Sequence, residues 1–299
     1  MNLFFYFFFI IFSLSSQAGE FDTRFKDGNA YNLRKDEIRN NIQKQPFIID
    51  VVFEDEKSLG IGFFIKEDGT GLTSYHVVSK GKSFASIEGV VYPIEIIGFD
   101  EVLDVAIIKV KGFQSSAFNI AKNQEYLPAT KVSILEKRTQ TFGKILQNNQ
   151  NSFIFDIDIS VGFSGSPVFC GESVCGIITS FEKQTNHAIA TKTSKITKNF
   201  TEMLAGNNFK KKQFNFYVMD LQKYDSLSQD FENPKKNLGV LITYSDEENL
   251  QTWDIITQVN GQDVNNVQEM QGIISRIYAN EETVFTVIRG KQTIVISIP

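Results

Sequence analysis

The feature that most constrains the fold is a run of short apolar segments, separated by turns, over residues 46–190. Segments rich in Ile, Val and Phe with turn residues between them are typical of β-strands. The segments are FIIDVVFE, GIGFFIK, VVYPIEIIGF, VAIIKV, KVSIL, FIFDIDI, PVFC and CGIIT. Because no long helical period interrupts them, we predict a mainly β fold built from antiparallel barrels or sandwiches.

A second unit follows this region. Residues 194–204 show the first helical pattern, with Ile196, Phe200 and Leu204 four apart. We predict a domain over 46–205, a linker over 206–213, where Gly and Asn precede three Lys, and a second domain over 214–299. In the second domain we expect strands near 214–221 and 238–244, a helix near 266–278, and two closing strands, TVFTVIR and QTIVISI.

The N-terminus resembles a secretory signal. Residues 3–14 are apolar and lead to a Ser16-Gln17-Ala18 cleavage-like site. The apolar run is shorter than the roughly 20 residues of a membrane span. We therefore predict a signal peptide over 1–18, a polar segment over 19–45, and an exported protein, periplasmic or secreted. Because no Lys or Arg precedes the apolar run, a retained N-terminal anchor is the alternative.

Net charge and cysteine content indicate which classes of partner and ligand the chain can bind. The net charge of −5 argues against nucleic-acid binding, which requires a basic surface. Cys170 and Cys175 flank a turn-like tetrapeptide, and in an oxidising compartment we predict a disulfide between them. Two cysteines, with His76 and His187 far apart in sequence, supply too few ligands for a metal site. We predict no metal and no cofactor.

The stretch VGFSGSP places Ser164 between glycines and before a proline. Such a sequence is either a simple tight turn or the loop of a nucleophile. A nucleophilic serine needs a base, for which His76 in GLTSYHVV is a candidate, and an orienting carboxylate, for which Asp104 in EVLDVAIIKV is a candidate. Taken singly, these are equally well a structural histidine and an acid that ends a strand. Together, the order His76, Asp104, Ser164 is that of double-barrel serine proteases.

Three segments carry a specific resemblance. GIGFFIKEDGTGLTSYHVV, DVAIIKV and FIFDIDISVGFSGSPVFCGESVCGIIT resemble, in order, the histidine, aspartate and serine segments of HtrA-like proteases on the chymotrypsin fold. TWDIITQVNGQDVNNVQEM is similar to the core of bacterial PDZ domains. The resemblance implies a double six-stranded β-barrel, a trypsin-like serine protease domain, followed by a small α+β PDZ domain over 214–299.

The resemblance also implies the roles of particular residues. The backbone N–H groups of Gly162 and Ser164 would form the oxyanion hole. The family usually has Gly-Asn-Ser-Gly-Gly-Pro, so Phe163 and Ser166 depart from its pattern, and the spacing from Asp104 to Ser164 is short. The resemblance implies cleavage after small aliphatic residues. Further candidates for contact with substrate are Phe163, Ala188, Ala190 and Asp158.

Asp158 lies six residues before Ser164, where enzymes that prefer Lys or Arg carry an acid. Its alternation with Ile157 and Ile159 instead places it on the polar face of a strand, which is the interpretation we favour.

In the second domain a groove for peptide C-termini would involve the stretch QFNFYVMDL, which lacks the usual glycine of the carboxylate-binding loop. The candidate residues are Phe216, Tyr217, Val218, Met219 and Ile273. The far wall would be the helix that contains Met270, Ile273 and Ile274; these apolar residues could equally pack inward as core.

The predicted function is an ATP-independent serine endopeptidase that cleaves unfolded or misfolded polypeptides with PDZ-assisted binding. The alternative is a catalytically silent scaffold that binds protein C-termini. A serine hydrolase on an α/β sheet would require helices between the strands, and the pattern does not contain them. The resemblance suggests a homotrimer, with Phe21, Phe25 and Tyr31 as candidate contacts; a solvated leader is the alternative for that segment.

Overall fold

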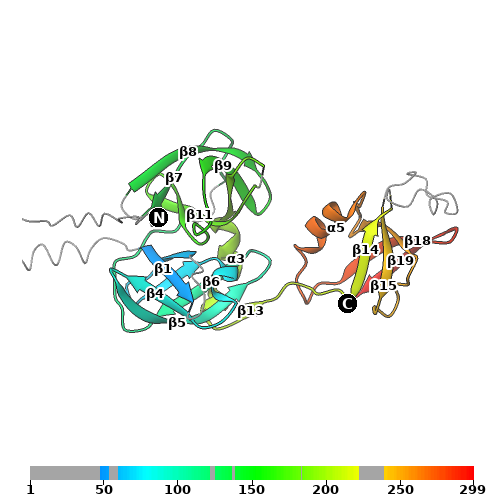
Figure 1. Ribbon diagram of the computed structural model, residues 1–299, viewed down its shortest axis with the longest axis horizontal. Coiled ribbons are helices and arrows are strands. Elements are labelled where there is room, and N and C mark those ends of the chain that lie inside the picture. Colours follow the sequence, from blue (N-terminus) through cyan, green and yellow to red (C-terminus); the bar gives the residue numbers. More distant parts are fainter. Residues whose placement is uncertain (1–47, 54–59, 122–124, 137–138, 183, 222–238) are drawn as a thin grey trace, which may run out of the picture. The chain divides into compact units, whose positions relative to one another are not determined.

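The computed structural model describes residues 48–53, 60–121, 125–136, 139–182, 184–221 and 239–299. Residues 48–204 contain two closed six-stranded β-barrels, and a smaller mixed unit follows (Figure 1). The predicted mainly β, double-barrel fold is therefore confirmed.

The first barrel contains six antiparallel strands: β1 (Ile48–Phe53), β2 (Gly60–Phe64), β3 (Thr70–Thr73), β4 (Ser83–Ile87), β5 (Val90–Asp100) and β6 (Val105–Val110). It closes because the long β5 pairs with both β4 and β6. Alternate residues of each strand face inward, and Phe64, Ala85 and Ile108 are fully buried in its centre. The short helix α2 (Tyr75–Val78) follows β3 and buries Val77 and Val78 in the same cluster.

The second barrel repeats this construction with β7 (Lys131–Glu136), β8 (Thr139–Asn148), β9 (Ser152–Asp158), β10 (Pro167–Cys170), β11 (Ser173–Phe181) and β12 (His187–Lys192). Its core contains Phe153, Phe155, Val168 and Ile178, which are all inaccessible to solvent. The FIFDIDI pattern gives β9 alternating buried and more exposed positions, as a two-sided strand requires.

Helix α3 (Thr193–Leu204) packs against a cluster that draws on both barrels. Its Ile196 and Met203 are buried with Phe63 of the first barrel and Ile177 of the second. The next residues, which were expected to be a linker, include the strand β13 (Asn208–Phe209), and β13 pairs in parallel with the end of β5. The segment after the barrels is therefore hydrogen-bonded to the first barrel.

In the described residues of the C-terminal unit, a sheet packs against helix α5. The strands β14 (Phe216–Asp220), β15 (Val240–Ser245), β16 (Ile255–Val259), β18 (Thr283–Arg289) and β19 (Gln292–Ile298) lie in that order, and β17 (Gln262–Asp263) pairs with β16. Helix α5 (Val267–Ile274) is capped at its N-terminus by Asn266, whose side chain accepts a hydrogen bond from the N–H of Glu269. The buried carboxylate of Asp254 is held by two 2.7 Å hydrogen bonds from the Arg289 guanidinium.

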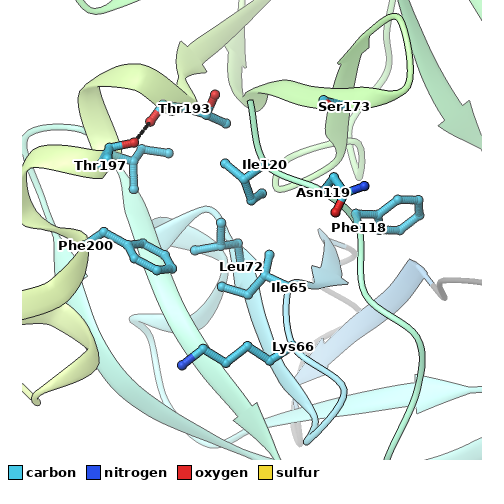
Figure 2. A pocket seen from close by; sticks show the side chains of 11 residues that line it. Ile65, Lys66, Leu72, Phe118, Asn119, Ile120, Ser173, Thr193, Thr197 and Phe200 are labelled. Carbon is cyan, nitrogen blue, oxygen red and sulfur yellow. Dashed lines mark hydrogen bonds between the residues drawn. The ribbon is translucent and has the colours of Figure 1, made fainter. Parts of the chain in front are cut away.

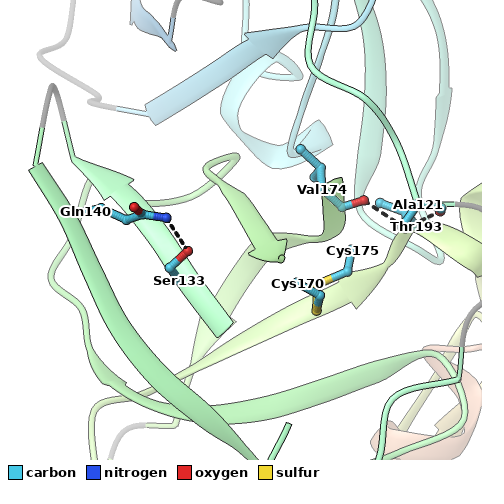
Figure 3. Close-up of a disulfide and its surroundings, with 7 residues drawn as sticks. All are labelled: Ala121, Ser133, Gln140, Cys170, Val174, Cys175 and Thr193. Carbon is cyan, nitrogen blue, oxygen red and sulfur yellow. Dashed lines mark hydrogen bonds between the residues drawn. A yellow bond between two sulfur atoms is a disulfide. The ribbon is translucent and has the colours of Figure 1, made fainter. Parts of the chain in front are cut away.

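Cys170 and Cys175 form a disulfide across the β10–β11 hairpin, as predicted (Figure 3). Their Cα atoms are 5.6 Å apart, within the range that a disulfide spans. Nearby, Thr193 at the start of α3 donates its hydroxyl to the carbonyl of Ala121 at 2.9 Å. The hairpin is thus fastened internally by the disulfide and lies beside the segment that connects the barrels.

Removing the disulfide should have a small, local effect. We expect Cys170→Ser with Cys175→Ala to lower the free energy of unfolding by about 2 kcal/mol, because closing so short a loop removes little entropy from the unfolded chain. Urea denaturation of oxidised and double-variant protein measures the difference. Intact mass of protein from an oxidising compartment should show no free thiol, and two free thiols there would contradict the pairing.

Candidate active site

His76 lies on helix α2, and the two residues that precede this helix set its position. The hydroxyl of Thr73 donates to the carbonyl of Ile61 at 2.6 Å, and the buried hydroxyl of Ser74 donates to the carbonyl of Ile178 at 2.8 Å. These bonds attach the end of β3 to β2 of its own barrel and to β11 of the other barrel. The side chain of His76 stays 48% exposed and accessible to a ligand.

Asp104 contacts His76 with both carboxylate oxygens. Oδ2 lies 2.7 Å from His76 Nδ1, and Oδ1 accepts the backbone N–H of His76 at 2.9 Å. The Asp104 carbonyl accepts the N–H of Tyr75 at 3.1 Å. A carboxylate on Nδ1 favours the tautomer with the proton there and leaves Nε2 unprotonated. The structure thus brings together two of the three predicted triad residues in the arrangement of a base and its orienting acid.

Ser164 lies on the loop between β9 and β10, and this loop is held by the same backbone groups. The Ser164 carbonyl accepts the N–H of Ile61 at 2.8 Å, and the N–H of Gly165 donates to the carbonyl of Ile178 at 2.7 Å. Ile61 and Ile178 therefore bind both the loop that carries Ser164 and the segment that carries His76. Among the described residues Ser164 Oγ makes no hydrogen bond; contacts between base and nucleophile are often long before substrate binds.

The glycines around Ser164 have conformations that other residues avoid. Gly162 has φ 106° and Gly165 has φ 89°. The N–H of Phe163 closes a turn onto the carbonyl of Ser160 at 3.4 Å, with Gly162 at the position where a type II turn requires a positive φ. Within the described part of the chain, the N–H groups of Gly162 and Ser164 donate to no acceptor. Two free backbone donors beside a serine are what an oxyanion hole requires.

The other residues predicted to contact substrate lie in different surroundings. Ala188 and Ala190 are fully buried in the core of the second barrel, and Phe163 packs against that core from the loop. Asp158 is exposed at the end of β9, opposite His187 of β12. Its exposure agrees with the favoured interpretation of an outward-facing strand residue.

A groove of about 440 Å³ lies between β14 and α5 of the C-terminal unit. Of the residues predicted there, Phe216 and Val218 line it, together with Met270 and Ile274 of the expected helix. Side chains of β14 alternate between the two faces of the sheet, so the other predicted strand residues lie outside the groove. Tyr217 is 71% exposed and its ring contacts Tyr244, and Met219 packs in a separate cluster. Ile273 packs against the core of the unit.

A second cavity, of about 450 Å³, lies apart from the predicted triad residues, none of which lines it (Figure 2). Its walls come from the β2–β3 hairpin, the inter-barrel segment and α3, and its apolar lining residues include Leu72, Ile120 and Phe200.

The described residues contain no group of three or more His, Cys, Asp or Glu side chains placed to hold a metal ion. Among the described helices none is long and apolar enough to span a membrane.

The middle of the chain matches a known protein family. Residues 60–177, which include His76, Asp104 and Ser164, match the family model described as "Trypsin-like peptidase domain". Residues 60–177 are therefore similar to trypsin-like peptidase domains, and the double barrel has the chymotrypsin-like fold. HtrA-type proteases are among the proteins that the chain resembles, which agrees with the resemblance seen in its sequence motifs.

Two sequence relatives are named as serine proteases. The chain is 27% identical over 275 residues to Serine protease HTRA1 of Xenopus laevis, covering 80% of this chain and 59% of that protein. It is 25% identical over 266 residues to the Probable periplasmic serine endoprotease DegP-like of Chlamydia trachomatis, covering 80% and 53%. The chain thus spans little more than half the length of these relatives.

Solved structures share the fold. The serine endoprotease from Yersinia pestis aligns with a TM-score of 0.57 at 18% identity, covering 86% of this chain and 94% of that one. The HtrA-type protease AlgW with tripeptide aligns with a TM-score of 0.56 at 17% identity, covering 86% and 93%.

Sequence reasoning missed the residues that hold the site together. Ile61, Ile178 and Thr73 are ordinary apolar or β-branched strand residues, and two of them act through backbone groups. Backbone donors and acceptors are present at nearly every position. No sequence signal could therefore have distinguished them.

Proposed function

We propose that this chain is a serine endopeptidase in which Ser164 is the nucleophile, His76 the general base and Asp104 the orienting acid. The observation that carries the proposal is the double contact of Asp104 with His76. His76 Nε2 would take the proton of Ser164 Oγ as that oxygen attacks a peptide carbonyl, and would return it to the leaving amine. The free N–H groups of Gly162 and Ser164 would bind the oxyanion.

The proposed substrates are unfolded or misfolded polypeptides, cut without ATP. The exposed His76 and the partly exposed Ser164 support an open site that an extended chain can reach. The relative named as a periplasmic endoprotease supports export as the setting. The signal over 1–18 and the trimer contacts of Phe21, Phe25 and Tyr31 fall outside the described residues and stay predictions.

Covalent labelling tests the nucleophile directly. The purified protein should digest casein, and a fluorophosphonate should block digestion while adding its mass to the peptide that contains Ser164. Labelling is informative beside digestion because it requires an activated serine but no particular substrate. Absence of both digestion and label would favour the silent scaffold, and a label on another serine would refute the assignment of Ser164.

We further propose that the C-terminal unit is a PDZ domain that binds peptide C-termini. β14 lies at one end of the sheet order, where an added strand can pair, and the apolar groove runs between it and α5. PDZ domains bind extended peptides in this way. The groove would accept an apolar terminal side chain between Val218 and Ile274.

Peptide binding should depend on the terminal carboxylate. We expect a peptide that ends in an apolar residue to bind at least 10-fold more tightly with a free than with an amidated terminus, because only the free form offers the charged acceptor. Val218→Ala should weaken binding, whereas Tyr217→Ala, on the other face of the same strand, should not. Isothermal titration measures both. Equal affinity of free and amidated peptides would indicate a docking module instead.

A further inference from the structure

The turn that carries Asp104 also contacts parts of the molecule other than His76. Asp100 ends β5, the turn covers residues 101–104, and β6 starts at Val105. The side chain of Asp100 is completely buried, and its Oδ1 accepts the N–H of Leu103 at 2.9 Å. Asp100 therefore holds the turn from within by binding Leu103, the residue directly before Asp104.

The second oxygen of Asp100 is held from outside the barrel. Oδ2 accepts a hydrogen bond from Asn199 Nδ2 of α3 at 2.9 Å and from the hydroxyl of Tyr278 at 3.0 Å. Tyr278 belongs to the C-terminal unit, just beyond α5. Burial raises the pKa of Asp100 despite these bonds, and burial together with Asp100 raises the pKa of Tyr278. A buried carboxylate that loses one of its donors is costly, so the position of Tyr278 matters to this turn.

A second set of contacts ties Tyr278 to the same place. The N–H of Glu101, the first residue of the turn, donates to the carbonyl of Phe209 in β13 at 2.8 Å. Glu101 Oε2 accepts the N–H of Lys211 at 2.8 Å, and Lys211 in turn forms a β-bridge with Tyr278. The ring of Tyr278 meets the ring of Phe209 edge-on, with centroids 6.3 Å apart. The hydroxyl of Tyr278 is thus delivered to Asp100 by backbone pairing.

The conformation of Asp104 explains why the turn needs support. Asp104 has φ 53°, a left-handed conformation that is uncommon outside glycine. On the side of the second barrel, the hydroxyl of Thr191 donates to the carbonyl of Leu103 at 2.9 Å. Both backbone groups of Leu103 are therefore bound, the N–H by Asp100 and the carbonyl by Thr191. The residue before Asp104 has little freedom to move.

We propose that Asp100 and Tyr278 are positioning residues for Asp104, so that the C-terminal unit supports the geometry of the active site through one hydrogen bond. The inference rests on the proposed function of His76, Asp104 and Ser164. When the Tyr278 hydroxyl is absent, Asp100 Oδ2 keeps only Asn199, the turn relaxes, and the Asp104 carboxylate moves from His76 Nδ1. Peptide bonds would then be cut more slowly, with substrate binding unchanged.

The test uses the full chain with Tyr278→Phe, which removes only the hydroxyl and keeps the ring on Phe209. The substrate is a short fluorogenic peptide with an amidated end, so that the C-terminal groove is not involved. We expect kcat to fall about 10-fold with KM unchanged, since the interaction concerns the transition state. Asn199→Ala, which removes the other donor to the same oxygen, should act in the same direction. Tyr217→Phe, an exposed tyrosine of the same unit, should leave kcat unchanged.

Proton NMR separates positioning from a general structural effect. The proton shared by His76 Nδ1 and Asp104 should give a low-field signal, assigned by its persistence in His187→Gln. We expect this signal to weaken in Tyr278→Phe and to stay in Tyr217→Phe. Unchanged kcat in Tyr278→Phe, or reduced kcat with an unchanged His76 signal, would overturn the inference. An inactive, unlabelled wild-type protein would overturn the proposed function instead.

Discussion

Ser164→Ala should reduce turnover of casein by about 10⁶-fold, to the residual rate that binding and the oxyanion hole supply alone. Asp104→Asn should cost about 10⁴-fold, because an amide opposite Nδ1 stabilises the wrong histidine tautomer. Neither change removes a buried group that the barrels need, since Ser164 is partly exposed and Asp104 is 27% exposed. Both proteins should therefore stay folded.

Steady-state kinetics with circular dichroism would measure these effects. The matched control is Glu172→Gln, which removes one exposed carboxylate from the disulfide hairpin of the same domain. It should keep the wild-type rate. If Ser164→Ala digests casein as fast as the wild type, Ser164 is not the nucleophile.

Gly165→Ala should be the most damaging single-methyl substitution in the nucleophile loop. A Cβ atom at residue 165 would lie 1.9 Å from the carbonyl oxygen of Ile61 and 2.5 Å from the hydroxyl of Thr73. The φ of 89° adds backbone strain for any side chain. Because the blocking atom belongs to the backbone of β2, the loop must move, and the N–H of Ser164 moves with it.

We expect Gly165→Ala to lower the free energy of unfolding by roughly 3 kcal/mol and to abolish turnover. Gly171→Ala is the matched control: its φ is also positive, at 67°, but a Cβ there would meet nothing within 4 Å. It should cost only about 1 kcal/mol and keep activity. Thermal unfolding and casein digestion of both variants decide the point; equal behaviour of the two would contradict the role of the close approach to Ile61.

The C-terminal groove shows where sequence reasoning was accurate and where it was not. A strand and a helix lie where the sequence predicted them, but of the predicted strand residues only Phe216 and Val218 line the groove, and Tyr217 is exposed on the opposite face. Within QFNFYVMDL the four consecutive residues 216–219 are all apolar, so they contain no clear period from which the inward residues could be chosen. Which side faces the helix depended on packing.

By itself the sequence determined the features that depend on neighbours along the chain. The strand pattern, helix α3, the Cys170–Cys175 hairpin and each of the three short motifs around the candidate triad residues are local, because periodicity and turn chemistry act over a few residues. Only the tertiary structure decided how these parts are held. Ser74 meets Ile178 across 104 residues, Thr191 meets Leu103 across 88, and Tyr278 meets Asp100 across 178. Such contacts join common hydroxyl side chains to a backbone carbonyl or a buried carboxylate, so they leave no pattern in the sequence and exist only in the folded chain.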